Sequence, residues 1–249
     1  MVCIVRFYEK PALNNPVLIE GLPGIGFVAN IAVLHLVQEL KAKQFGEIRS
    51  SFFQDFAITA EKGKIRSPIN ELYYHKGKDR EKDLILLHGN TQALTTLGQY
   101  ELCGRILDIG EELGCHQIMT LGGLKREGKV DAPEIYCAAS DRETLHEALS
   151  FGAKIIGGNI FGVAGLLIGL AKLRGMKGLC LLAETPGYPD APAAREVLKV
   201  VCKMLQLKVD LARLDAAAEE TRKILGSFGL IPPPTEEKER REPRSRWLI

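Results

Sequence analysis

Short, almost entirely apolar runs alternate with longer segments of helical periodicity along most of this chain. The runs "PVLIEG", "DLILLHG", "QIMTLGG" and "KGLCLLAE" have the length and composition of buried β-strands. Three of them precede the helical patterns "FVANIAVLHLVQEL", "LTTLGQYELCGRILDIGEELG" and "PAAREVLKVVCKML". Strands that are apolar on both sides need helices on both faces of the sheet. The alternation therefore predicts an α/β fold with a mostly parallel, twisted sheet flanked by helices.

One segment departs from this alternation. Between the first helical pattern and "DLILLHG" lie "SFFQDFAIT" and "INELYYHKG", joined by the polar turn "AEKGKIRSP". Turn residues between two β-rich runs are typical of a hairpin, which we expect to extend the main sheet. The apolar residues of "SFFQDFAIT" are not all used by this assignment, and they favour a homo-oligomer.

The pattern changes again in the C-terminal part of the chain. Residues 1–209 carry the α/β pattern and are interpreted as the core domain. In "DLARLDAAAEETRKILGSFG" apolar residues recur at helical spacing before Gly229, which predicts a docked helix over 210–230. Residues 231–249 are rich in proline and in charges of both signs, which predicts a flexible tail.

Charge and cysteine usage exclude several classes of function. The 249-residue chain has a net charge of +2, which is no electrostatic footprint for nucleic acid. Its six cysteines occur singly, without CxxC or metal-ligand spacing, which indicates reduced thiols in the cytoplasm. Residues 155–171 are uncharged but glycine-rich and short for a membrane span, so a buried strand, turn and helix are favoured. We expect a cytoplasmic protein with no metal, cofactor, nucleic-acid or membrane partner.

Small residues gather where the predicted strands end, in "EGLPGIG", "HGNTQ", "LGGL", "GGN" and "ETPGYPD". In open α/β sheets, ligands bind in the crevice beyond the carboxyl ends of the strands. The residues predicted to line a possible ligand crevice are Glu20, Gly21, Gly24, Gly26, Asn90, Gly122, Gly123, Asn159 and Glu184. The alternative is that the glycines only make tight turns between strands and helices.

The same segments lack the spacing of known nucleotide or catalytic sites. Gly21, Gly24 and Gly26 are spaced GxxGxG, which is neither the dinucleotide fingerprint nor a phosphate-binding loop with its lysine. His88 is the histidine at a strand end, where a structural role is favoured over a catalytic one, and His35 is expected to pack within its helix. The chain contains no nucleophile elbow, HExxH or paired-carboxylate motif. We therefore assign no catalytic residue.

The segments "LIEGLPGIGFVAN", "LLHGNTQ", "LGGL" and "ETPGYPDAPAAREVL" together resemble the proteasome assembly chaperone family in its archaeal and bacterial forms. The resemblance runs from about Val17 to Met204. It implies a phosphorylase-like α/β fold without clear catalytic machinery, homo-oligomers, and association with the proteasome core particle. The implied function is a non-enzymatic chaperone or adaptor. The alternatives are a phosphorylase-like or other small-metabolite enzyme that uses the glycine-rich crevice, and a structural oligomer whose tail has no client.

The resemblance also implies a role for the last three residues. Proteins that dock on the proteasome α ring commonly end in a hydrophobic residue, then tyrosine, then any residue. Trp247 and Ile249 fit the first and third positions, whereas Leu248 lacks the tyrosine hydroxyl associated with gate opening. The resemblance thus implies that Trp247, Leu248 and Ile249 bind α subunits, with docking better supported than activation. The alternative is an uninformative frayed end.

Overall fold

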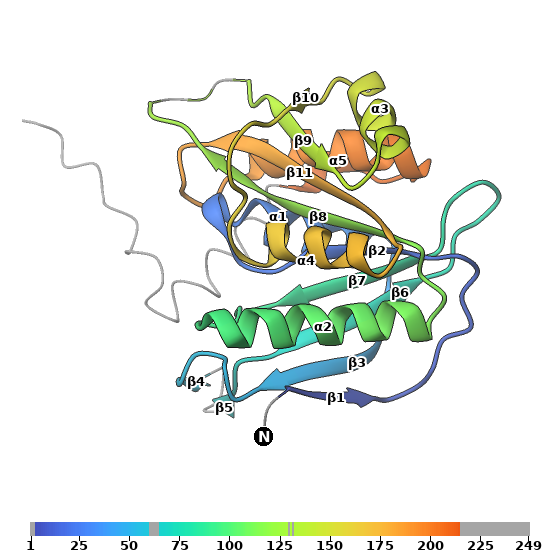
Figure 1. Ribbon diagram of the computed structural model, residues 1–249, viewed down its shortest axis with the longest axis vertical. Helices are drawn as coiled ribbons and strands as arrows, with labels where there is room; N and C mark the ends of the chain where they lie inside the picture. The colour runs from blue at the N-terminus through green and yellow to red at the C-terminus, as the bar shows by residue number, and fades with distance from the viewer. Residues whose placement is uncertain (1–2, 60–64, 129, 131, 215–249) are drawn as a thin grey trace, which may run out of the picture.

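A computed structural model describes residues 3–59, 65–128, 130 and 132–214, and within them the chain forms an α/β fold (Figure 1). The strands are β1 (Cys3–Phe7), β2 (Val17–Gly21), β3 (Lys43–Ser50), β4 (Ile58–Thr59), β5 (Ile65–Arg66), β6 (Asn70–His75), β7 (Leu84–Gly89), β8 (Gln117–Lys125), β9 (Ile135–Ala139), β10 (Lys154–Ile155) and β11 (Lys177–Thr185). The α-helices are α1 (Val28–Glu39), α2 (Thr96–Glu112), α3 (Arg142–Ser150), α4 (Gly162–Leu173) and α5 (Ala191–Leu205). The 3-10 turns are η1 (Ile25–Phe27) and η3 (Leu211–Arg213).

The described strands other than β4 and β5 form one mixed sheet in the order β1-β3-β6-β7-β2-β8-β11-β9-β10. Its centre, β7-β2-β8-β11, is parallel. These four strands are the apolar runs of the sequence, and all five residues of β2 are buried. Antiparallel strands extend the sheet on both sides, β6, β3 and β1 on one and β9 on the other. The predicted fold class is confirmed.

Helices cover the two faces of the sheet (Figure 1), and a hydrophobic cluster lies between the sheet and the helices on each face. On one face, Val17 and Ile19 of β2 pack with α1 and α5. On the other face, Leu18 packs with α2 and α4. Alternate residues of a strand point to opposite faces, so a strand in the centre of the sheet must be apolar throughout. This is why β2 and β7 appear in the sequence as continuous apolar runs.

The predicted hairpin is only partly right. Its second arm is β6, which joins the main sheet, but β6 pairs with β3 and β7 and not with "SFFQDFAIT". Most of that segment is turn and irregular backbone, and β4 at its end pairs with β5 in a separate small sheet. The register of β3 shifts between Gln44 and Gly46, so Phe45 and Ile48 face the same cluster although they are three residues apart. This bulge removes the period-two pattern by which β3 would be recognised.

The described chain ends on the α1 side of the sheet. After α5, Leu207 and Leu214 are buried in the cluster formed with α1. The ring of His35 is buried and its Nε2 lies 2.8 Å from the carbonyl oxygen of Asp210, so the expected packing role of His35 is confirmed. The 3-10 turn η3 occupies the start of the helix predicted over 210–230. The rest of that helix and the tail predicted over 231–249 lie outside the described residues.

The uncharged stretch at residues 155–171 becomes the last residue of β10, a connecting loop and most of α4. This matches the expected strand, turn and helix. Among the described residues, no helix has both the length and the apolar composition needed to cross a membrane.

Candidate functional site at the carboxyl edge of the central strands

The end of β2 and the loop that follows it pack closely against α1 and against the end of β11. A Cβ atom on Gly21 would lie 2.3 Å from the Cβ of Val33, so only glycine lets α1 approach the end of β2. Gly26 has a φ of 64°, in the left-handed region, and a Cβ there would lie 2.6 Å from the hydroxyl of Thr185. Both glycines therefore serve close packing and turn geometry. For Gly21 and Gly26, the alternative stated from the sequence is the one that the geometry supports.

The loops "EGLPGIG" and "ETPGYPD" contact each other across the edge of the sheet. The backbone N–H of Asp190 donates to the carbonyl of Gly26 at 3.0 Å. The Asp190 side chain accepts from the hydroxyl of Thr185 at 2.8 Å and from the N–H of Ala193 at 2.9 Å. Asp190 is thus the N-cap of α5 and also holds the loop after β11 against the loop after β2.

Two asparagines satisfy backbone groups where β2 and β7 end. The buried Asn30 amide donates to the carbonyl of Gly89 at 2.7 Å and to that of Gly21 at 3.2 Å. Asn90 exchanges hydrogen bonds with Ile69, since the Asn90 side chain accepts from the Ile69 N–H at 2.9 Å and the Asn90 N–H donates to the Ile69 carbonyl at 3.1 Å. Asn90, which follows β7, is therefore tied to Ile69, which precedes β6. Asn90 also lines a recess of about 260 Å³ beside Gly24.

A second cavity, of about 280 Å³, lies at the carboxyl ends of β2, β8 and β11, under the residues that lead into α4. Five of the nine predicted crevice residues line it: Glu20, Gly24, Gly122, Gly123 and Asn159. Its walls are otherwise mainly apolar, from Leu22, Ile25, Leu121, Leu124, Ile156, Ile160, Phe161, Ala164 and Leu182, with Gln92 and Lys125 adding polar atoms. The sequence therefore brought together much of the lining of one cavity, and ligand binding there stays a prediction.

Glu20 is the ionisable residue at the base of this cavity. Its side chain is buried, and its Oε1 accepts a hydrogen bond from the N–H of Leu22 at 2.7 Å. Its Oε2 has no hydrogen-bond partner among the residues described. Burial raises the pKa of Glu20 to about 8, against the smaller opposing effect of the Leu22 hydrogen bond. A carboxyl group in this state is largely protonated at neutral pH.

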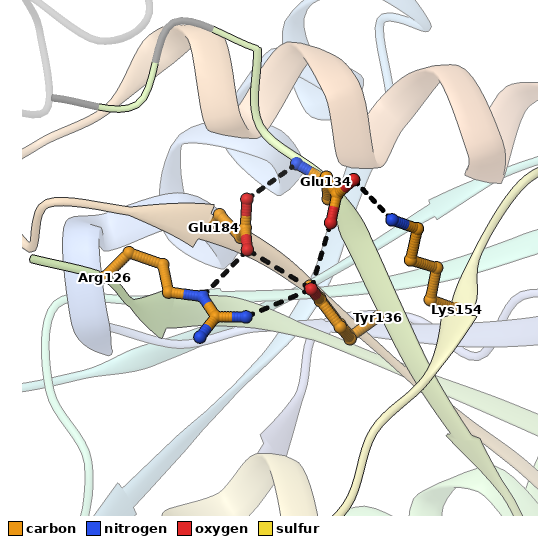
Figure 2. A network of polar contacts seen from close by, with 5 residues as sticks. All are labelled: Arg126, Glu134, Tyr136, Lys154 and Glu184. Carbon is orange, nitrogen blue, oxygen red and sulfur yellow. Dashed lines mark hydrogen bonds and ion pairs between the residues drawn. The ribbon is translucent and has the colours of Figure 1, made fainter.

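Glu184 lies outside this cavity and belongs to a polar network at the ends of β9 and β11 (Figure 2). Its carboxylate accepts from Nε of Arg126 at 2.8 Å and from the hydroxyl of Tyr136 at 3.3 Å. The backbone N–H of Glu134 donates to the same carboxylate at 3.3 Å, and the Glu134 side chain pairs with Lys154. The Lys154 ammonium lowers the pKa of Glu134, with a smaller contribution from the Tyr136 hydroxyl. Glu184 therefore secures the two ends of the β8–β9 connection rather than lining a crevice with Glu20.

His88 lies on β7, beside Gly21 in the register of β2 and β7. Burial lowers the pKa of His88 to about 4, and its Nε2 has no hydrogen-bond partner among the described residues. The ring is therefore neutral at physiological pH. It is not part of the lining of the Glu20 cavity, and this supports the structural role preferred from the sequence.

Metal ligands and thiols are the remaining groups that could carry chemistry at this site. No group of three or more histidine, cysteine, aspartate or glutamate side chains in this part of the chain has the arrangement of a metal site. The thiols of Cys103 and Cys180 have their pKa raised to about 12 by burial, so they are protonated and poorly nucleophilic. The cavity can accommodate a small molecule and offers Glu20 as its buried hydrogen-bonding group.

Sequence reasoning missed residues that support the site indirectly. Asn30 was visible as a polar residue in the apolar pattern "FVANIAVL", which is a signal of a buried hydrogen-bonding role. Arg126 and Tyr136 had no comparable local signal, because their contacts with Glu184 depend on how the β8–β9 connection folds back.

Fold and site together define a class: an α/β protein whose sheet has a parallel centre and glycine-rich loops at its carboxyl edge. The chain belongs to the PAC2 family, whose family model matches residues 18–227. It is 37% identical over 213 residues to the uncharacterized protein MJ1210 of Methanocaldococcus jannaschii, which covers 83% of this chain and 80% of that protein.

Two solved structures from Pyrococcus furiosus extend this result. PbaB, described as an archaeal proteasome activator, has a TM-score of 0.82 and 38% identity, covering 92% of this chain and 99% of PbaB. PbaA, described as an archaeal homolog of proteasome-assembly chaperone, has a TM-score of 0.75 and 28% identity, covering 91% of this chain and 98% of PbaA. The family predicted from the sequence motifs is confirmed.

Proposed function

We propose that this chain is a non-enzymatic proteasome assembly chaperone or adaptor of the cytoplasm, which binds the α ring of the core particle through its C-terminal tail. The observation that carries the proposal is its likeness to PbaB over 92% of the chain at 38% identity. A likeness of this extent concerns the whole folded core and not one motif. The archaeal origin of PbaA, PbaB and MJ1210 agrees with an archaeal source for the chain.

The docking element in this proposal is the C-terminal sequence "WLI", which lies outside the described residues. Trp247 offers a large apolar side chain for a groove between neighbouring α subunits. The terminal carboxylate of Ile249 can pair with a lysine at the base of such a groove. Residues 232–244 are rich in proline and charge and give the triplet reach.

Homo-oligomerisation would strengthen such docking, because several tails can engage several equivalent pockets of a ring at once. Part of the reason given from the sequence for an oligomer does not hold, because Phe53 of "SFFQDFAIT" is buried in the core, whereas Phe52 is only partly buried. A different apolar surface supports it. Phe161 is 84% exposed and Leu173 is 82% exposed along a groove of about 760 Å³ between α2 and α4, and we propose a second copy of the chain as its occupant.

The experiment compares binding to purified archaeal proteasome core particles by the full-length protein and by a deletion of Trp247–Ile249. We expect the deletion to weaken binding at least about tenfold, since it removes both the apolar side chains and the correctly placed carboxylate. Leu248→Tyr should retain binding and increase peptide hydrolysis by the core particle if a tyrosine hydroxyl opens the gate. Arg244→Ala, outside the triplet, is the matched control. Equal binding by the full-length and deleted proteins would reject the tail as the docking element.

The alternative function is a small-metabolite enzyme that uses the crevice, and the observation in its favour is the cavity around buried Glu20. This alternative requires that the purified protein convert a substrate into a product. Phosphorolysis or hydrolysis of a nucleoside or sugar phosphate by the purified protein, lost in Glu20→Gln while the fold is intact, would favour this alternative. If the purified protein leaves these substrates unchanged, and if its binding to core particles depends on the tail, the adaptor function is favoured.

A further inference from the structure

The cavity around Glu20 combines an apolar interior with one buried carboxyl group. Glu20 lies on β2 opposite Thr120 of β8 and on the same side of the sheet as Leu18, facing α4. The hydroxyl of Thr120 is already used, because it donates to the carbonyl of Ala164 at 2.8 Å. The neighbouring polar group is thus satisfied within the protein, whereas Oε2 of Glu20 is not.

This unmet oxygen is unusual for a native protein. Buried side-chain oxygens almost always have a hydrogen-bond partner, and one that lacks a partner calls for a specific explanation. Leaving a buried polar group unpaired destabilises the folded state. The hydrogen bond from the Leu22 N–H accounts for Oε1 of Glu20. It leaves Oε2 without a structural role among the described residues.

Within the described part of the chain, the charged and titratable groups around Glu20 do not provide a counter-charge. Cys103 from α2 and Cys180 from β11 interact electrostatically with Glu20, and both are neutral thiols because burial raises their pKa to about 12. Lys125, which also lines the cavity, is exposed at the end of β8. About 16 Å of strand separates it from Thr120, the β8 partner of Glu20.

We propose that this cavity is a binding site for a small organic amine, whose ammonium group donates to Oε2 of Glu20 and whose hydrocarbon body packs against Leu22, Ile156 and Leu182. An ammonium ion supplies both features that the site lacks, a hydrogen-bond donor and a positive charge. A hydroxyl group would supply only the hydrogen bond. Gly122 borders the cavity, and a Cβ there would lie 2.8 Å from Cδ2 of Leu182, so a larger residue would crowd this wall.

The volume limits the size of the ligand. A water molecule takes up about 30 Å³ in the liquid, so a cavity of about 280 Å³ accommodates on the order of ten non-hydrogen atoms. This matches an amine with one ring or a short branched chain and is smaller than a whole nucleotide. The proposal concerns binding alone and does not depend on the proposed role at the proteasome.

Amine binding at this site is linked to pH in a defined direction. Free Glu20 is largely protonated below pH 8, and pairing with an ammonium ion requires it to release that proton. Between pH 6 and pH 7 the affinity for an amine should therefore rise close to tenfold, and it should level off above about pH 8. A ligand that only hydrogen-bonds to the neutral carboxyl group shows no such rise.

The test uses the full-length protein and three probes of matched shape: benzylamine, benzyl alcohol and benzoate. Binding is followed by the methyl NMR signals of Leu22 and Leu182, which also report where the probe binds. We expect benzylamine to bind at pH 8 at least tenfold more tightly than benzyl alcohol, and benzoate not to bind. Glu20→Gln should weaken benzylamine binding at least tenfold and remove its pH dependence. Glu184→Gln makes the same chemical change outside the cavity and should leave the affinity within twofold.

A second variant separates loss of the site from loss of the fold. Ala164→Leu fills part of the cavity without touching the carboxyl group, and it should weaken binding of benzylamine while the methyl spectrum stays dispersed. The proposal is overturned if benzyl alcohol or benzoate binds as tightly as benzylamine, or if Glu20→Gln binds benzylamine as the unaltered protein does. It is equally overturned if no probe shifts the Leu22 and Leu182 signals at millimolar concentration, in which case Glu20 is hydrated by water alone.

Discussion

Asn30 offers the sharpest test of how the carboxyl edge of the sheet is held together. Its side chain is 5% exposed, and one amide group donates to the carbonyls that end β7 and β2, at 2.7 Å to Gly89 and 3.2 Å to Gly21. In Asn30→Ala both carbonyls remain buried and lose their donor. Each unpaired group costs about 1–3 kcal/mol, with the longer bond to Gly21 contributing less. We expect the free energy of unfolding to fall by about 3 kcal/mol.

The measurement is urea denaturation followed by circular dichroism, with the slope of the transition checked for equality between variants. Asn159→Ala is the matched control, because Asn159 is exposed at the same edge, and its change should stay within about 0.5 kcal/mol. A loss below about 0.5 kcal/mol for Asn30→Ala would refute the reasoning, since it would mean that the two carbonyls find water or another donor without cost.

The isosteric change Asn30→Asp adds a pH dependence with a defined sign. An ionised carboxylate would face two carbonyl oxygens, so the pKa of the introduced group must be higher in the folded protein than its unfolded value of about 3.9. A raised folded pKa means that the folded state holds the proton more tightly, and the variant is then least impaired at low pH. Its deficit relative to the unaltered protein should grow as the pH rises above about 4. A deficit that is the same at pH 4 and pH 7 would contradict the two donated hydrogen bonds.

Three further predictions follow from the described contacts. The pKa of Glu20 is about 8 in the folded protein against an ordinary value of 4.5, so its ionisation favours unfolding as the pH rises between these two values. The free energy of unfolding of Glu20→Gln should therefore exceed that of the unaltered protein by on the order of 3 kcal/mol at pH 7 and should not exceed it at pH 4. Gly123→Ala places a Cβ 2.2 Å from the carbonyl oxygen of Ile25 and should lower the free energy of unfolding by at least about 1 kcal/mol, whereas Gly157→Ala, with open space around it, should be near neutral. All six cysteines are free, and only Cys202 is not fully buried. A thiol reagent should therefore modify at most Cys202 quickly in the native protein, and all six cysteines in urea. Rapid modification of several cysteines in the native protein would contradict their burial.

The amino-acid sequence by itself determined the class of the fold and the place of the crevice. Continuous apolar runs such as that of β2 can be buried only in a sheet covered on both faces, and this physical requirement is local to each run. The glycine-rich segments after these runs had to lie at one edge, because parallel strands end at the same edge. Five crevice residues met in one cavity for this reason, and the motifs that resemble the proteasome assembly chaperones lie in the same loops.

Tertiary structure decided which of these residues face one another. Glu20 and Glu184 both stand near the ends of central strands, yet Glu20 is buried facing α4 and Glu184 is paired with Arg126. Nothing local to either glutamate distinguishes them, because the difference depends on where α4 and the β8–β9 connection return to the sheet. The bulge that hides β3 has the same origin, since the pairing of β3 with β1 and β6 sets its register. Periodicity along the chain specifies which face a side chain takes, and only the distant segments packed on that face specify its partner.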